Sequence, residues 1–256
     1  MPDRPYILFE SRWKTVRSTD YDTAVLPWGA VEAHNLHLPY GTDVIQSEYI
    51  AAESARIAWD RGARVLVLPA VPFGVNTGQL AIRGDINMNP STQLAVLRDV
   101  AESLSHQGMR KLVVLNGHGG NEFKPMIREL QPKFPKLFLC LVNWYQTVPL
   151  GDFFADTGEH GAEMETSNLL VIAPELVLPL AEAGEGRLRP FRLEGLKSGT
   201  AWAPRDWLKA TSDTGIGNPA EASAEKGRRY LRAVTEKIGA FLAELVKADP
   251  DRLYES

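Results

Sequence analysis

The sequence is poor in cysteine and has no long hydrophobic or basic run. Its one cysteine, Cys140, cannot form a disulfide within the chain, which permits a reducing compartment. The first residues lack the apolar stretch of a secretory signal, and no run approaches the ~20 apolar residues that a membrane helix needs. Lys and Arg total 28 against 32 Asp and Glu, so the net charge of −4 disfavours nucleic-acid binding through phosphate contacts. These absences predict a soluble cytoplasmic protein that acts on neither a membrane nor a nucleic acid.

The chain has 256 residues, of which 44% are hydrophobic, so it can bury a sizeable core. Short apolar runs indicate strands at 23–28, 64–69, 111–115 and 137–142. Helical periodicity indicates helices at 43–60, 90–107, 121–131, 162–172 and about 219–247. Strands that alternate with helices predict a three-layer α/β/α sandwich with a mainly parallel sheet. No composition break divides the chain, so we expect a single domain over 1–256.

The first cluster of polar residues, 32–43, follows the strand predicted at 23–28. Glu32 and His34 are two residues apart, so both side chains point the same way in an extended segment. Asp43 opens the next helix, where a carboxylate is stabilised. Imidazole and carboxylate groups together favour divalent Zn, Mn or Fe. The alternative is an ordinary N-cap at Asp43 and a loop histidine at His34.

Two further clusters each contain one histidine. His118 lies in Asn116–Asn121, a glycine-rich loop that follows the strand predicted at 111–115. A tight turn or a phosphate-binding loop would also explain these glycines. His160 opens the third cluster, His160–Ser167, at the start of a predicted helix where capping is the alternative. Strand exits of one α/β sheet converge on one edge, so the three clusters predict a shared site.

Together the three clusters resemble the motifs of the creatininase family of metal-dependent amidohydrolases. Residues 29–43 match the pattern G-x-x-E-x-H-x-x-H-L-P-x-x-T-D, and Asn116–Asn121 match N-G-H-G-G-N without change. His160–Ser167 match H-A-G-E-x-E-T-S with the two small residues exchanged, and 211–227 resemble a fourth stretch. The resemblance implies a hexamer of three-layer α/β/α subunits, each with two divalent metal ions.

The resemblance also implies a role for each matching residue. Glu32 and His118 would bind one metal ion, His34 the other, and Asp43 would bridge the two. His160 would be the catalytic acid and base, and its neighbour Glu159 is a candidate to orient it. Such a centre would hydrolyse a C–N bond of a small-molecule amide through an activated water.

The chain departs from the creatinine-hydrolysing members at one metal ligand. Those members carry a glutamate where this chain has Gly120, and we expect Glu163 to complete the second metal site instead. They also place tryptophans around creatinine, whereas the position four before His160 is Asp156 here. Both differences weigh against creatinine as the substrate. Other branches of the family act on formamides, a short peptide or a cyclic diketone.

Long segments without periodicity are expected to line the substrate pocket. They lie at 73–88, 144–158 and 198–216, and Trp144 and Trp202 are the tryptophans expected to contact substrate. The backbone at Gly119 and Gly120 can approach the substrate closely. Two other classes of function stay open, a non-catalytic metal-binding or assembly module and a nucleotide-binding protein. The intact ligand positions argue against the first, and a lack of bound metal in the purified protein would favour it. Thermal stabilisation by nucleotides but not by divalent metals would support the second.

Overall fold

Four parallel strands form one sheet in the computed structural model, which describes residues 4–255. The strands are β1 (Thr23–Trp28), β2 (Val65–Val67), β3 (Lys111–Asn116) and β4 (Phe138–Asn143), in the order β2-β1-β3-β4. β1 and β3 pair along their whole length, from Thr23 with Lys111 to Trp28 with Asn116. Every residue of both strands is buried, which explains why their sequences are almost continuously apolar.

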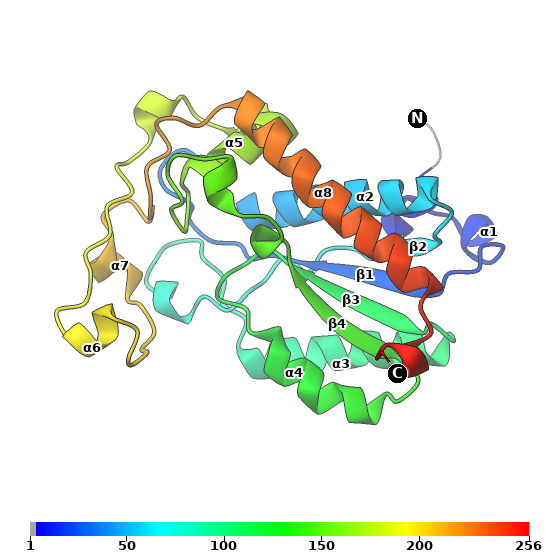
Figure 1. Ribbon diagram of the computed structural model, residues 1–256. Helices are drawn as coiled ribbons and strands as arrows, with labels where there is room; N and C mark the ends of the chain where they lie inside the picture. The colour runs from blue at the N-terminus through cyan, green and yellow to red at the C-terminus, as the bar shows by residue number, and fades with distance from the viewer. Residues whose placement is uncertain (1–3, 256) are drawn as a thin grey trace.

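Helices cover both faces of this sheet (Figure 1). On one face lie α2 (Thr42–Asp60), α5 (Glu163–Ile172) and α8 (Ala224–Lys247), and on the other lie α3 (Pro90–His106) and α4 (Phe123–Leu130). Because strand side chains alternate, Val25 faces one core and Leu26 the other. The predicted three-layer α/β/α architecture with a parallel sheet is therefore confirmed.

Shorter elements complete the described part of the chain. Three short helices are α1 (Trp13–Val16), α6 (Glu194–Lys197) and α7 (Trp207–Ala210). Single 3-10 turns occupy Leu8–Glu10, Thr77–Gln79, Gln131–Lys133, Trp144–Gln146, Leu150–Asp152, Pro174–Leu176, Leu180–Glu182 and Pro250–Arg252. Among the described residues, no helix is long and apolar enough to cross a membrane.

Two predicted boundaries are corrected by the structure. The last helix starts at Ala224 rather than near 219, because the hydroxyl of Ser223 accepts the backbone N–H of Lys226 as an N-cap. The second strand is limited to Val65–Val67, the three residues that pair with β1.

The strand order creates a crevice where β1 and β3 end. The chain leaves β1 through α2 to reach β2 on one side, and it reaches β3 on the other side through α3. The loops that follow β1 and β3 therefore separate, which is where open α/β sheets bind ligands. Gly29 permits this arrangement, because a Cβ there would lie 2.7 Å from the backbone nitrogen of Val44 in α2.

Candidate metal centre

Five buried side chains from four segments meet at this crevice. Glu32 and His34 follow β1, Asp43 lies in the first turn of α2, His118 follows β3, and Glu165 lies in the first turn of α5. The ligand atoms of Glu32, Asp43 and His118 lie within 4.8 Å of one another, as do those of His34, Asp43 and Glu165. A third set joins Glu32, His34 and His160. Asp43 belongs to the first two sets, so the geometry suits two cations that share one carboxylate.

The first set leaves carboxylate oxygens without hydrogen-bond donors. The Nδ1 atom of His118 lies 2.8 Å from Glu32 Oε1 and 3.0 Å from Asp43 Oδ2, yet neither oxygen takes part in a hydrogen bond. His118 Nε2 faces the carbonyl of Val75 at 3.1 Å. A carbonyl only accepts, so Nε2 carries a proton, and Nδ1 is the ring atom that faces the two carboxylates and can bind a metal. Buried carboxylate oxygens without hydrogen-bond partners, beside an imidazole nitrogen, fit a divalent cation.

The second set also places an imidazole nitrogen beside two carboxylates. His34 Nδ1 faces the backbone carbonyl of Glu32 at 3.1 Å and donates to it, so Nε2 points at the carboxylates and forms a hydrogen bond with Asp43. That atom lies 3.1 Å from Asp43 Oδ1 and 3.6 Å from Glu165 Oε1. The other carboxylate oxygen of Glu165 accepts the backbone N–H of Gly161 at 2.6 Å. Backbone contacts thus hold an imidazole and a carboxylate of this set toward a common point.

The electrostatics of the cluster also favour positive charge. Burial lowers the pKa of His34 and His118, but nearby carboxylates outweigh burial and raise both pKa values well above the ordinary value. Burial raises the pKa of Asp43, yet the neighbouring imidazoles, His34 first among them, bring its net pKa down to about 2. The carboxylates therefore stay ionised inside the protein and attract cations.

Glu163 does not join the cluster, contrary to the sequence-based prediction. Its fully buried carboxylate forms an ion pair with Lys226 and accepts the backbone N–H of Asp156 at 2.8 Å. Successive residues of a helix are rotated by about 100° around its axis. Glu165, two residues after Glu163, therefore lies on nearly the opposite side of α5. The carboxylate that reaches His34 is that of Glu165.

Position 120 has no room for a ligand. A Cβ on Gly120 would collide with the carbonyl oxygen of Val75 and would lie 2.5 Å from His118 Nε2. The loop after β3 therefore offers one candidate ligand, His118, and helix α5 offers the additional carboxylate, that of Glu165.

His160 lies beside the cluster with one ring nitrogen available. Its Nε2 donates to the carbonyl of Ala33 at 2.8 Å, so Nδ1 is unprotonated and lies 3.9 Å from Glu32 Oε1. Its ring stacks on His34 with centroids 4.0 Å apart, and Trp207 packs against it in an edge-to-face arrangement with centroids 4.7 Å apart. Burial lowers the pKa of His160, and the neighbouring His34 lowers it further. A neutral imidazole at this position can accept a proton.

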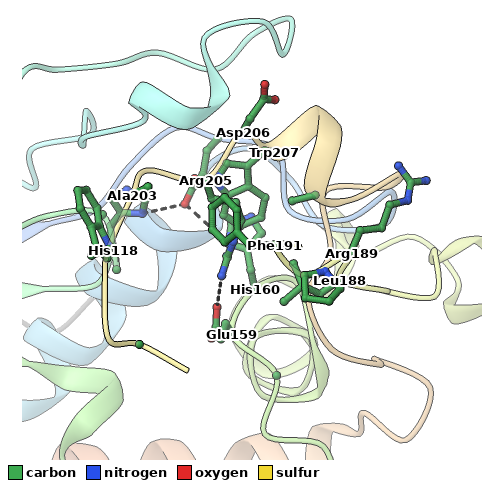
Figure 2. Close-up of a pocket in the computed structure, with 18 of the residues that line it drawn as sticks. His118, Glu159, His160, Leu188, Arg189, Phe191, Ala203, Arg205, Asp206 and Trp207 are labelled. Carbon is green, nitrogen blue, oxygen red and sulfur yellow. Dashed lines mark hydrogen bonds and ion pairs between the residues drawn. The ribbon is translucent and has the colours of Figure 1, made fainter. Parts of the chain in front are cut away.

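The structure does not support the expected role of Glu159. Its side chain is 66% exposed and pairs with Arg205 at 3.2 Å instead of contacting the neighbouring imidazole (Figure 2). The backbone carbonyl of Ala33 orients His160 in its place.

Two residues of the segments expected to line the pocket support the cluster through contacts that the sequence does not predict. Gln79 hydrogen bonds Glu32 Oε2 through its side-chain amide, and Trp207 contacts His160. Both lie in long segments without periodicity, where the sequence predicts a pocket but not individual contacts. The signal for Glu165 was present, because it belongs to the same motif as Glu163.

A pocket of about 1370 Å³ opens onto the cluster, with Glu32, Asp43 and His118 among its lining residues. The four residues expected to contact substrate, Gly119, Gly120, Trp144 and Trp202, all line it. Trp144 is buried, with its indole N–H 3.3 Å from the hydroxyl of Ser47, whereas Trp202 is 85% exposed. Segment 73–88 contributes no lining residue, contrary to expectation. Segments 144–158 and 198–216 both contribute lining residues, as expected. Much of the wall comes from residues 187–209, which overlap the second of these segments and which we call the covering segment (Figure 2).

Comparisons with known proteins agree with this geometry. The family model described as "Creatininase: Creatinine amidohydrolase" matches residues 10–242. A candidate creatinine amidohydrolase from Bacteroides fragilis NCTC 9343, known from its crystal structure, is 44% identical, with 99% of this chain and 100% of that chain covered and a TM-score of 0.93. The mycofactocin precursor peptide peptidase of Mycobacterium tuberculosis is 28% identical over 224 residues, 83% of this chain and 81% of that protein. Solved creatininases in Mn and Zn–Zn forms are 22% and 23% identical, cover 95% of this chain and 99% of theirs, and have TM-scores of 0.77 and 0.78.

Proposed function

The chain belongs to the creatininase family, and from that premise we propose that it is a metal-dependent hydrolase of the C–N bond of a cyclic amide, formamide or similar small amide. The observation that carries this proposal is the pair of buried ligand sets that share Asp43 at the base of a large pocket. A non-catalytic module has no need for a free acid–base group beside such sets, and His160 provides one.

Two divalent ions fit the residues of the cluster. Glu32, Asp43 and His118 would hold one ion, and His34, Asp43 and Glu165 the other. Carboxylate and imidazole donors suit Zn, Mn or Fe, and solved relatives contain Zn or Mn. Such ions lower the pKa of water toward 7 and polarise a carbonyl group.

The chain's own residues supply proton transfer and positioning. His160 Nδ1 accepts a proton from the attacking water and passes it to the leaving nitrogen. The Ala33 carbonyl keeps the required tautomer, and Trp207 and His34 hold the ring between them. The backbone at Gly119 and Gly120 lines the pocket, where its N–H groups would stabilise a developing oxyanion.

Hydrolysis of a short peptide is the second candidate function. It is favoured by the pocket volume of about 1370 Å³, which exceeds the roughly 300–1,000 Å³ typical of small-molecule sites. The peptidase relative from Mycobacterium tuberculosis supports the same class.

We further propose that the protein is cytoplasmic and forms a homo-oligomer, namely the hexamer that the family resemblance implies. Large exposed apolar side chains support assembly, among them Phe9, Trp13 and Trp202. The single cysteine is compatible with a reducing compartment. Light scattering coupled to size exclusion measures the assembly directly, and a monomeric mass would refute it.

Metal analysis combined with a substrate panel tests the proposed function. We expect His34→Ala and Asp43→Ala to lose bound metal and hydrolysis of cyclic amides, formamides and short peptides. His106→Ala, at the last residue of α3, is the matched control and retains both. Full metal content and full activity in the two site variants would refute the proposal.

A further inference from the structure

The covering segment carries a concentration of positive charge that the rest of the chain does not share. Residues 187–209 contain six basic and two acidic residues, within a chain whose net charge is −4. Five of the basic residues line the pocket together with the carboxylate cluster: Arg189, Arg192, Lys197, Arg205 and Lys209. Cations therefore gather on the part of the pocket wall that the covering segment forms.

Two of these five cations are already paired. Lys209 contacts Asp206 at 2.7 Å, and Arg205 contacts Glu159 at 3.2 Å. Among the described residues, no carboxylate forms an ion pair with Arg189, Arg192 or Lys197. The other acidic residues of the lining are Glu32, Asp43 and Glu165, which belong to the candidate metal centre. Three cations of the wall are left for a ligand.

Arg205 extends this positive wall toward the catalytic group. Its guanidinium lies 5.2 Å from the ring centroid of Trp207, the residue whose edge packs against His160. Figure 2 shows the Arg205 side chain reaching from the covering segment to Glu159, close to His160. Its bond to Glu159 is a partly exposed single contact, and such pairs contribute little stability. A ligand anion can therefore replace Glu159 as its partner.

From these observations we propose that the substrate is an amide with an anionic group, a carboxylate or a phosphate, remote from the bond that is cleaved. The cations of the covering segment receive this group while the amide lies at the metal centre. Guanidinium groups form directed, charge-assisted hydrogen bonds with such anions. The volume of the pocket, about 1370 Å³, accommodates a substrate with two such ends. This inference rests on the proposed function, since it places the amide at the ligand cluster.

Binding of matched hydroxamates to the Zn²⁺-loaded protein tests the inference. The probes are butyrohydroxamate, which is neutral at its far end, succinic monohydroxamate, which ends in a carboxylate, and 3-phosphonopropionohydroxamate, which ends in a phosphonate. We expect calorimetry to show at least about tenfold tighter binding of an anionic probe, a difference of about 1.4 kcal/mol. The preference decreases as NaCl is raised, because the cations are exposed to solvent. Comparison of the two anionic probes distinguishes a carboxylate from a phosphate substrate.

A charge-reversal pair provides the control. We expect Arg192→Glu/Lys197→Glu to lose the preference for the anionic probes. Arg12→Glu/Lys14→Glu makes the same change in net charge at α1, at the opposite end of the molecule, and keeps the preference (Figure 1). Circular dichroism checks that both double variants fold.

Two negative outcomes are distinguishable. The proposal of an anionic substrate is overturned if the neutral and anionic probes bind with equal affinity. It is also overturned if no probe binds to protein that holds two Zn²⁺ ions. Either result leaves the proposed metal centre intact. Failure of the wild-type protein to bind Zn²⁺ at all overturns the proposed function, and this inference with it.

Discussion

Replacement of Gly120 by alanine should disturb the candidate metal centre without replacing any of its ligands. The added Cβ would collide with the carbonyl oxygen of Val75 and lie 2.5 Å from His118 Nε2, the two atoms whose 3.1 Å hydrogen bond orients the imidazole. The methyl group must therefore displace either the loop or the ring. Gly119→Ala is a matched control, because no atom lies within 4 Å of a Cβ at that position.

The magnitude follows from two contributions. Overpacking a tight site costs roughly 1–3 kcal/mol, and loss of the His118 hydrogen bond costs about 1 kcal/mol more. At roughly 2–4 °C per kcal/mol for a chain of this size, Tm falls by roughly 4–16 °C. Loss of the partner that orients a metal-binding histidine lowers metal affinity by roughly 10–100-fold.

Two assays measure these effects on Gly120→Ala, Gly119→Ala and the wild type. Differential scanning calorimetry gives Tm for the metal-free proteins, and competition with a fluorescent chelator gives the Zn²⁺ affinity. We expect both quantities to fall for Gly120→Ala and to stay near wild type for Gly119→Ala. If Gly120→Ala matches the wild type in both, the claim that this position must be glycine to orient His118 is wrong.

Three further predictions use other buried groups. Glu165→Gln should reduce the number of ions bound per chain, whereas Glu163→Gln should keep that number; mass spectrometry of the native proteins counts the ions, and the reverse pattern would contradict the ligand set. The hydroxyl of Tyr230 is buried without a hydrogen-bond partner among the described residues, so Tyr230→Phe should stabilise the fold by about 1 kcal/mol in urea unfolding; a loss of stability would refute this. Burial lowers the pKa of His37 from 6.5 to about 4, so in this pH range the unfolded chain binds a proton at His37 that the folded chain does not. The free energy of unfolding of the wild type should therefore decrease as the pH is lowered from 6.5 to 4, and His37→Gln should remove that part of the pH dependence.

The sequence predicts the fold and the strand-exit residues well for a physical reason. Parallel strands all end at the same edge, so Glu32, His34 and His118 are brought together by topology without knowledge of loop paths. Asp43 follows from the same reasoning, since the helix after β1 must start at that edge.

The choice between Glu163 and Glu165 lies beyond the sequence pattern. Both lie in the first turn of α5, and a shift of one residue in the start of that helix changes which side each faces. What decides is a contact distant in sequence, because Lys226 on α8 pairs with Glu163.

The course of the covering segment also depends on contacts between residues that are distant in sequence. A Cβ on Gly78 would collide with the carbonyl oxygen of Arg205, so this backbone approach requires glycine.

The covering segment supplies no residue to either ligand set, and His160 lies outside it as well. In the proposed function, reaction chemistry and substrate choice are consequently encoded largely in separate stretches of the gene, with Trp207, which packs against His160, common to both. Mutations at the other positions of 187–209 can accumulate and retarget the proposed hydrolase while the residues of the candidate metal centre stay unchanged. Such modularity makes this stretch the natural place to randomise in a directed-evolution library that seeks new amide substrates.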